Sequence, residues 1–347
     1  MRVRIHGVIL AAACMAVSSS AAIACTPAYV SAPGDSLFSI AEDNLGEMTK
    51  WSLLLSTNLH LAGSDISAVP NGTVMAIPCP VAPVTVEEPV LTSAVVEGRD
   101  DNGLQLLTGG TYAPFTGQDL PQNGLITELV AAALDRSPAQ ITYSVSWDDD
   151  WSQHQFPVLA HSEFDMGFPA MKPDCDTGST AQICTDFLYS EPLMNMPIML
   201  FVNAKNQFQF NTDNDVLGKS ICRPAGFFTH DLDGENRRWI SDGLIDFVQG
   251  ESVNDCFAMV AAGEVDAASV NLFLGASVIL DMGLRNTVVP LEKPLSDEGL
   301  HVVVSKNHWR ATAHLYRINA GLKELRESGA YQEIVTRHLR HFQARLQ

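Results

Sequence analysis

LQLLTGGTYAPFTGQDLPQNGLITELV, residues 104–130, is the stretch that decides the fold. Its first five residues form an apolar segment typical of a buried strand, and a turn with two glycines follows. The turn carries the aromatic residues Tyr112 and Phe115, and a helix with apolar spacing is predicted to open near Gly124. Such a strand, turn and helix place backbone groups and flat rings where a small ligand could meet them.

Apolar segments separated by turn signals continue the alternation of strand and helix to the end of the chain. Strands are predicted at residues 141–146, 163–170, 197–202, 263–267, 288–294 and 299–305, a strand and turn at 217–226, and helices at 156–160, 256–262, 311–328 and 331–346. Some 250 residues are enough for two lobes with their own cores. The pattern predicts an α/β domain.

Four motifs follow one another along these segments: Tyr112-Ala113-Pro114-Phe115, Phe187 to Pro192, Leu217-Gly218-Lys219 and Gly263 to Ala267. In this order they resemble family 3 solute-binding proteins, which serve amino-acid-type ABC transporters in the periplasm. The resemblance implies a two-lobe type II periplasmic binding protein over residues 99–347. Lobe 1 is expected at about 99–192 and 296–347, and lobe 2 at about 193–295, with a ligand cleft between them.

A separate small unit is predicted at residues 25–80. Tyr29-Val30 begins a strand, Pro33-Gly34 makes a turn, two helices follow, and residues 70–78 form a closing strand, which gives the order βααβ. This unit resembles a LysM domain, a family that binds N-acetylglucosamine-containing glycans. The resemblance implies peptidoglycan as a partner and a glycan groove lined by Gly34, Asp35, Ser36 and Leu37.

Residues 1–24 have the basic head, apolar run and small residues of a secretory signal peptide, which predicts a periplasmic location. Lipid attachment at Cys25 remains an alternative. The chain has 21 Lys plus Arg against 40 Asp plus Glu, a formal charge of −19. So acidic a surface disfavours binding to nucleic acid or anionic lipid.

Six cysteines follow the signal peptide, an even number that favours disulfides in an exported chain. Their order suggests three pairs, although the sequence alone leaves the pairing open: Cys25 with Cys79, Cys175 with Cys184, and Cys222 with Cys256. Their spacing does not suggest zinc, and neither a metal nor a cofactor is expected.

Residues 81–98 are rich in proline, valine, threonine and glutamate without amphipathic period, which predicts an extended linker. Such a linker predicts that the small unit and the large domain move independently.

Amino-acid binders of the resembled family carry three signatures that this chain lacks. An arginine for the ligand carboxylate is replaced by Met171-Lys172, a Gly-Thr turn by Gly226-Phe227, and an acid for the amine by Asn271. Lysine does not reproduce the bidentate geometry of arginine, and asparagine has no charge to pair with an ammonium group. A sugar, an aromatic solute or a quaternary amine is therefore expected. The candidate ligand contacts are Tyr112, Phe115, Trp147, Phe168, Lys172, Arg223, Phe227 and Asn271.

These observations favour a monomeric periplasmic binding protein, not an enzyme, that delivers a small polar solute to an ABC transporter permease. Two alternatives remain open. One is a wall-associated sensor or accessory protein that binds a muropeptide, and the other is a dehydratase-type enzyme on the same fold.

Overall fold

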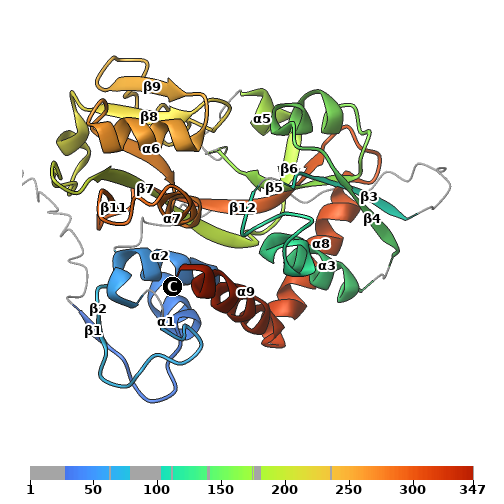
Figure 1. The fold of residues 1–347 in the computed structure, drawn as a ribbon. Coiled ribbons are helices and arrows are strands. Elements are labelled where there is room, and N and C mark those ends of the chain that lie inside the picture. Colours follow the sequence, from blue (N-terminus) through green and yellow to red (C-terminus); the bar gives the residue numbers. More distant parts are fainter. Residues whose placement is uncertain are drawn as a thin grey trace, which may run out of the picture.

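The computed structural model describes residues 28–61, 64–78, 103–110, 112–138, 141–173, 175, 181–234 and 237–346. They form two α/β lobes joined by long strands, with a small N-terminal unit (residues 28–78) beside the strands that join them (Figure 1). The predicted signal peptide and the linker lie outside the described residues. No helix in the described ranges combines the length and apolar character that a membrane crossing needs.

Lobe 1 is built on parallel strands that share one sheet. The strand β3 pairs with β4 on one side and with β5 on the other. The elements of this lobe are β3 (Leu104–Thr108), η3 (Pro121–Asn123), α3 (Leu125–Asp135), β4 (Tyr143–Trp147), α4 (Trp151–Gln153), η4 (His154–Leu159), β5 (Met166–Met171), α5 (Gln182–Thr185), β6 (Phe187–Tyr189), α8 (Ala311–Glu327) and α9 (Ala330–Leu346).

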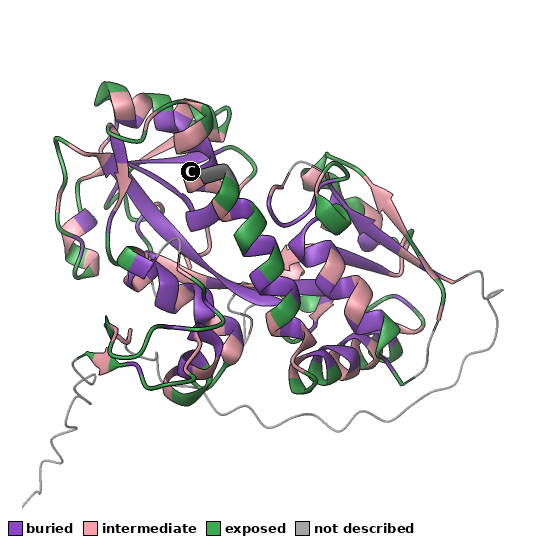
Figure 2. Ribbon diagram, turned by 60° about the horizontal axis from the view of Figure 1, so that its bottom comes forward, coloured by how far each residue is buried: buried purple, intermediate pink, exposed green. Residues whose placement is uncertain are grey.

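Two ten-residue strands cross from one lobe to the other. β7 (Met194–Asn203) pairs antiparallel with β12 (Ser296–Ser305) near the middle of the molecule, and each strand then joins the sheet of a different lobe. Nine of the ten residues in β7 are buried, as the crossing strands in Figure 2 show. A strand buried on both faces must be apolar throughout, which explains the unbroken run from Met196 to Val202.

Lobe 2 repeats the parallel arrangement with its own strands. Here β8 lies between β9 and β10, parallel to both, and β10 pairs antiparallel with β7. The elements are η5 (Asp213–Val216), β8 (Ser220–Pro224), β9 (Asp246–Gly250), α6 (Val253–Ala262), β10 (Ala267–Asn271), α7 (Leu272–Asp281) and β11 (Val288–Pro290).

The opening strand, turn and helix are confirmed. The helix α3 begins where backbone N–H groups of Leu125 and Ile126 donate to the carbonyls of Pro114 and Phe115, so the turn caps the helix. Gly124 has φ +103°, and a Cβ there would lie 2.4 Å from the carbonyl oxygen of Phe115. A side chain therefore does not fit at this position.

The N-terminal unit has the predicted βααβ order. Strands β1 (Tyr29–Val30) and β2 (Val74–Met75) pair antiparallel. Between them lie α1 (Leu37–Leu45), η1 (Met48–Lys50), α2 (Trp51–Thr57) and η2 (Leu59–Leu61).

The four residues expected to line a glycan groove have local structural roles. Asp35 accepts hydrogen bonds from the Tyr29 hydroxyl and the Ala32 N–H, each at 2.7 Å, and Ser36 caps α1. Gly34 lies in the turn at φ +94°. Leu37 is only 1% exposed. The expectation that Leu37 lines a surface groove is therefore corrected, because its side chain belongs to the core.

The N-terminal unit is packed against the large domain. Ser52 donates a buried hydrogen bond of 2.5 Å to the carbonyl oxygen of Asn195 on β7. The ring of Trp51 lies 6.1 Å from that of Phe273 on α7, and Phe38 lies edge-on to Tyr331 on α9 at 6.2 Å. The expectation of independent movement is wrong, since the two parts share one buried core.

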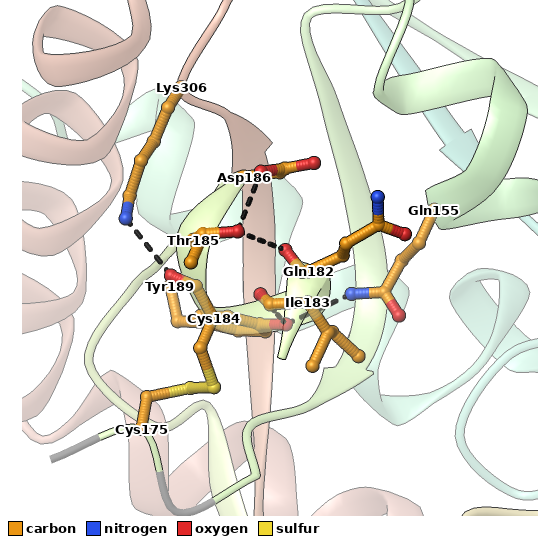
Figure 3. The surroundings of a disulfide bond; sticks show 9 residues. All are labelled: Gln155, Cys175, Gln182, Ile183, Cys184, Thr185, Asp186, Tyr189 and Lys306. Carbon is orange, nitrogen blue, oxygen red and sulfur yellow. Dashed lines mark hydrogen bonds between the residues drawn. A yellow bond between two sulfur atoms is a disulfide. The ribbon is translucent and has the colours of Figure 1, made fainter. Parts of the chain in front are cut away.

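Two disulfides are present in the described part of the chain, and both match the expected order. Cys222–Cys256 joins β8 to α6 in lobe 2. Cys175–Cys184 closes the segment after β5 in lobe 1, where Lys306 donates to the Cys184 carbonyl at 3.0 Å (Figure 3). Cys25 and Cys79 lie outside the described residues.

Candidate functional site

A small pocket lies where the carboxyl ends of strands from both lobes meet. It holds about 210 Å³ of empty space, part of it open to solvent. Lobe 1, the crossing strand and lobe 2 all contribute to its lining, which consists of Tyr112, Met171, Ile198, Arg223, Phe227, Phe228, Ser269, Val270 and Asn271.

A hydrogen bond joins the two lobes across this pocket. The Asn271 side-chain amide donates to the Tyr112 hydroxyl at 3.2 Å, while its Oδ1 accepts from the Leu274 N–H and caps α7. The Tyr112 hydroxyl also contacts the Met196 sulfur at 3.3 Å. Burial raises the pKa of Tyr112, so the hydroxyl stays neutral. The lobes are therefore in contact, and this contact explains the small volume.

Arg223 lines the pocket with its charge already paired. Its guanidinium makes a bidentate contact with Asp231, and both side chains are 1% exposed. It also donates to Ser269 Oγ at 2.6 Å and to the Phe228 carbonyl at 2.7 Å. Arg223, one of the candidate ligand contacts, thus lines the pocket, but Asp231 occupies its guanidinium fork.

Three further predicted contacts line the pocket and four do not. Tyr112, Phe227 and Asn271 are in the lining. Phe115 is fully buried behind Tyr112, with the ring centroids 5.1 Å apart, and Phe168 is 2% exposed within β5. Both are core residues, so their predicted direct contact with ligand is corrected. Trp147 ends β4 and is not among the lining residues.

Lys172 lies outside the pocket lining, just after β5. Burial lowers the pKa of His301 to about 4, and the charge of nearby Lys172 adds to this lowering. The charge of Lys172 thus acts near the crossing strand β12.

Five lining residues were not among the candidate ligand contacts, namely Met171, Ile198, Phe228, Ser269 and Val270. Met171 and Val270 end or nearly end parallel strands, and such positions are where open α/β sheets place ligands. A search at strand ends could have found these two. Ile198 lies where the pairing partner of β7 changes from β12 to β10. An apolar residue within an apolar strand carries no sequence signal for a binding site.

Within the described ranges, Asp165, His308 and His314 form a group whose potential metal-ligating atoms lie within 4.8 Å of one another. The group lies at the amino ends of β3 and β5, where the Gln105 N–H donates to Asp165 at 2.7 Å. The pocket is at the opposite ends of these strands.

The histidine tautomers disfavour a metal there. The Arg310 N–H donates to His308 Nδ1, and the Arg317 guanidinium donates to His314 Nδ1, each at 3.1 Å. In its neutral form each ring therefore carries its proton on Nε2, the atom that faces Asp165, whereas a metal would need the lone pair of that atom. Burial would raise the pKa of Asp165, but the Nε2 atoms of His308 and His314, which lie 2.9 and 3.5 Å from its Oδ1, and the Gln105 N–H outweigh burial and lower it.

No protein-family model matches the chain, and no curated protein matches it. Solved structures do share its fold. A histidine kinase sensor domain with similarity to periplasmic binding proteins aligns with a TM-score of 0.53 and 18% identity, over 69% of this chain and 97% of that one.

The GluR0 ligand-binding core in complex with L-glutamate aligns with a TM-score of 0.51 and 15% identity, over 70% of this chain and 100% of that one. A mutant of ArgBP from T. maritima gives a TM-score of 0.50 at 19% identity, over 67% and 93% of the two chains. At such identities the likeness shows the fold alone. The fold is that of a two-lobe type II periplasmic binding protein.

Proposed function

We propose that this chain is a periplasmic binding protein, not an enzyme, that captures a small solute between its lobes for an ABC transporter permease. The observation that carries the proposal is the pocket at the strand ends, lined from both lobes and from the crossing strand. Lobe closure over a solute is the motion that such an arrangement allows.

The chemistry of the pocket favours a neutral or aromatic-bearing solute over a plain α-amino acid. Of its nine lining residues Arg223 alone carries a charge, and Asp231 neutralises it. Phe227 and Phe228 offer ring faces, and Tyr112 and Asn271 offer polar atoms that a solute could engage in place of their mutual bond. None of these lining residues offers an unpaired guanidinium group that could bind a ligand carboxylate in a bidentate way.

Loss of the Phe227 ring is expected to weaken solute binding roughly 10-fold, because a stacked ring face contributes about 0.5–1.5 kcal/mol beyond its buried area. The test compares Phe227→Ala with wild type by thermal shift and then calorimetry. Neutral aromatic compounds, sugars, quaternary amines, muropeptides and amino acids form the panel. Phe208→Ala is the matched control, since Phe208 is a partly buried ring of lobe 2 outside the pocket lining.

Two results would contradict this assignment. If Phe227→Ala and Phe208→Ala bind the stabilising solute equally well, the pocket is not its site. If glutamate or arginine is the tightest ligand, the inference from the paired Arg223 is wrong. A muropeptide as the tightest ligand would favour the wall-associated sensor or accessory protein over the transporter.

We further propose that the N-terminal unit is a LysM domain that binds peptidoglycan. The βααβ order and the turn at Gly34 and Asp35 support this proposal. Because the unit shares a core with the large domain, the test uses the full chain, which should sediment with purified peptidoglycan and be released by N-acetylglucosamine oligomers. Full-length protein that stays in the supernatant would remove the proposal.

A further inference from the structure

The N-terminal unit touches lobe 1, the crossing strand and lobe 2 at once. Phe38 packs on Tyr331 of α9, which belongs to lobe 1. Ser52 bonds to the backbone of β7, and Trp51 packs on Phe273 of α7 in lobe 2. In Figure 1 the unit lies beneath the crossing strands, beside α9. A body attached on both sides of a hinge resists the separation of the lobes.

Phe273 is the residue through which this attachment reaches the pocket. It is 4% exposed, and it is surrounded by rings from three different parts of the chain. Trp51 of the N-terminal unit lies 6.1 Å away, Phe342 of α9 lies 5.9 Å away, and Phe115 of lobe 1 lies 5.6 Å away. The contacts of Phe273 with Phe342 and with Phe115 join lobe 2 to lobe 1.

A continuous aromatic chain therefore runs from Trp51 through Phe273 and Phe115 to Tyr112 in the pocket. The last step is a contact of 5.1 Å between the rings of Phe115 and Tyr112. Phe273 lies two residues after Asn271, whose amide bonds to the Tyr112 hydroxyl. The Asn271–Tyr112 and Phe273–Phe115 contacts thus both come from the start of one helix, α7. An opening that moves this end of α7 away from lobe 1 would break them together.

We propose that the N-terminal unit braces the two lobes in the closed arrangement, with Trp51 acting through Phe273 as a positioning residue for the pocket. Opening the cleft requires Phe273 to leave Phe115, while Trp51 and Phe38 hold α7 and α9 near each other. The unit therefore biases the closed state, and a bias toward the competent state increases apparent affinity. This last step rests on the proposed solute-binding function.

The test measures interlobe distance in the full-length, ligand-free protein. Bio-orthogonal spin labels are placed at Asp119 of lobe 1 and Ala225 of lobe 2, two exposed positions in loops that follow β3 and β8. Wild type should give a short, narrow distance distribution. Phe273→Leu should give a longer and broader one, because the leucine no longer fills the space among the three rings.

Phe257→Leu is the matched control. Phe257 is also a buried lobe 2 phenylalanine, but it packs on Phe201, 5.1 Å away within the same lobe. This variant should lose stability yet keep the wild-type distance distribution. Trp51→Leu should open the lobes as Phe273→Leu does, and the double variant should open them by less than the sum of the two single effects, since both remove the same contact.

For a solute identified with wild type, Phe273→Leu and Trp51→Leu should bind roughly 2- to 30-fold more weakly, the range found for residues that couple sites indirectly. If both variants keep the wild-type distances, the brace is refuted even where a solute binds. If no solute binds wild type while the distances shift as expected, the proposed function fails and the brace stands.

Discussion

Asp231→Asn is expected to lower the free energy of unfolding by about 3–5 kcal/mol, because removing one member of a buried ion pair leaves an uncompensated charge. The Arg223 guanidinium is 1% exposed, and Asp231 is its anionic partner in the described structure. Asp231 also accepts from Ser296 Oγ at 3.2 Å, so the variant weakens a contact with β12 as well. Urea denaturation at neutral pH measures the change.

The control for this prediction is Asp242→Asn. Asp242 pairs with Arg238 on the surface, where the two side chains are 47% and 63% exposed, and such pairs contribute about 0–1 kcal/mol. The double variant Arg223→Met with Asp231→Leu should be more stable than Asp231→Asn, because it buries no charge. An Asp231→Asn protein as stable as Asp242→Asn would show that Arg223 is not held in a buried pair.

Asp297→Asn is expected to stabilise the protein by about 2–3 kcal/mol above pH 6. Burial raises the pKa of Asp297 to about 6, the Asn195 hydrogen bond lowers it in part, and the charge of Glu298 raises it further. The Asn195 amide donates to Asp297 Oδ2 at 2.9 Å, but Asp297 Oδ1 and Asn195 Oδ1 are buried without a partner. A neutral amide at position 297 offers a donor and carries no charge.

The direction of this stability change with pH follows from how tightly the native and unfolded states bind the Asp297 proton. An unfolded aspartate has a pKa of about 3.9, so between about pH 4 and pH 6 the native state holds the proton more tightly than the unfolded state. The stability that Asp297 contributes is complete below about pH 4 and is lost as the pH rises through about 6. The two-unit difference corresponds to about 3 kcal/mol.

Denaturation of wild type and Asp297→Asn at pH 4, 6 and 8 should therefore show curves that separate as the pH rises. The exposed residue Glu292 provides the control variant Glu292→Gln, which should follow wild type at every pH. If the difference in unfolding free energy between Asp297→Asn and wild type is constant from pH 4 to pH 8, the raised pKa of Asp297 is contradicted.

The overall fold was predictable because local patterns and global topology agree. The apolar run at β3 and the glycine at position 124 defined the first strand, turn and helix correctly. Besides several short helical turns, a whole strand and a ten-residue helix were not predicted, namely β9 and α7. The helix α7 follows β10 without any turn, and its first residues are as apolar as the strand. The start signal was Asn271, a residue type that favours the N-cap, but Asn271 was interpreted as a ligand contact instead.

The pocket was only partly predictable, because sequence does not give the depth of a side chain. Phe115 and Phe227 are the same residue type in similar turns, yet the first is core and the second lines the pocket. The pairing of Arg223 with Asp231 spans an irregular loop, where no helical or strand period relates the two residues. Periodicity therefore could not reveal that the arginine was occupied.

The docking of the N-terminal unit was not predictable from its linker. A proline-rich segment without amphipathic period is typical of an extended connection, but it does not say whether the parts it joins associate. Trp51 fits a pattern of helical apolar spacing that the small unit could have used for its own core. In the structure its ring also packs against Phe273 of the large domain.

Native mass spectrometry tests the central claim, that a small solute binds between the lobes, most directly. Wild type and Phe227→Ala are compared as purified and after incubation with the solute panel. We predict that wild type carries one small molecule that is not a plain α-amino acid, and that Phe227→Ala carries it at clearly lower occupancy. Equal occupancy in the two proteins, or no bound molecule in wild type under either condition, would contradict the account.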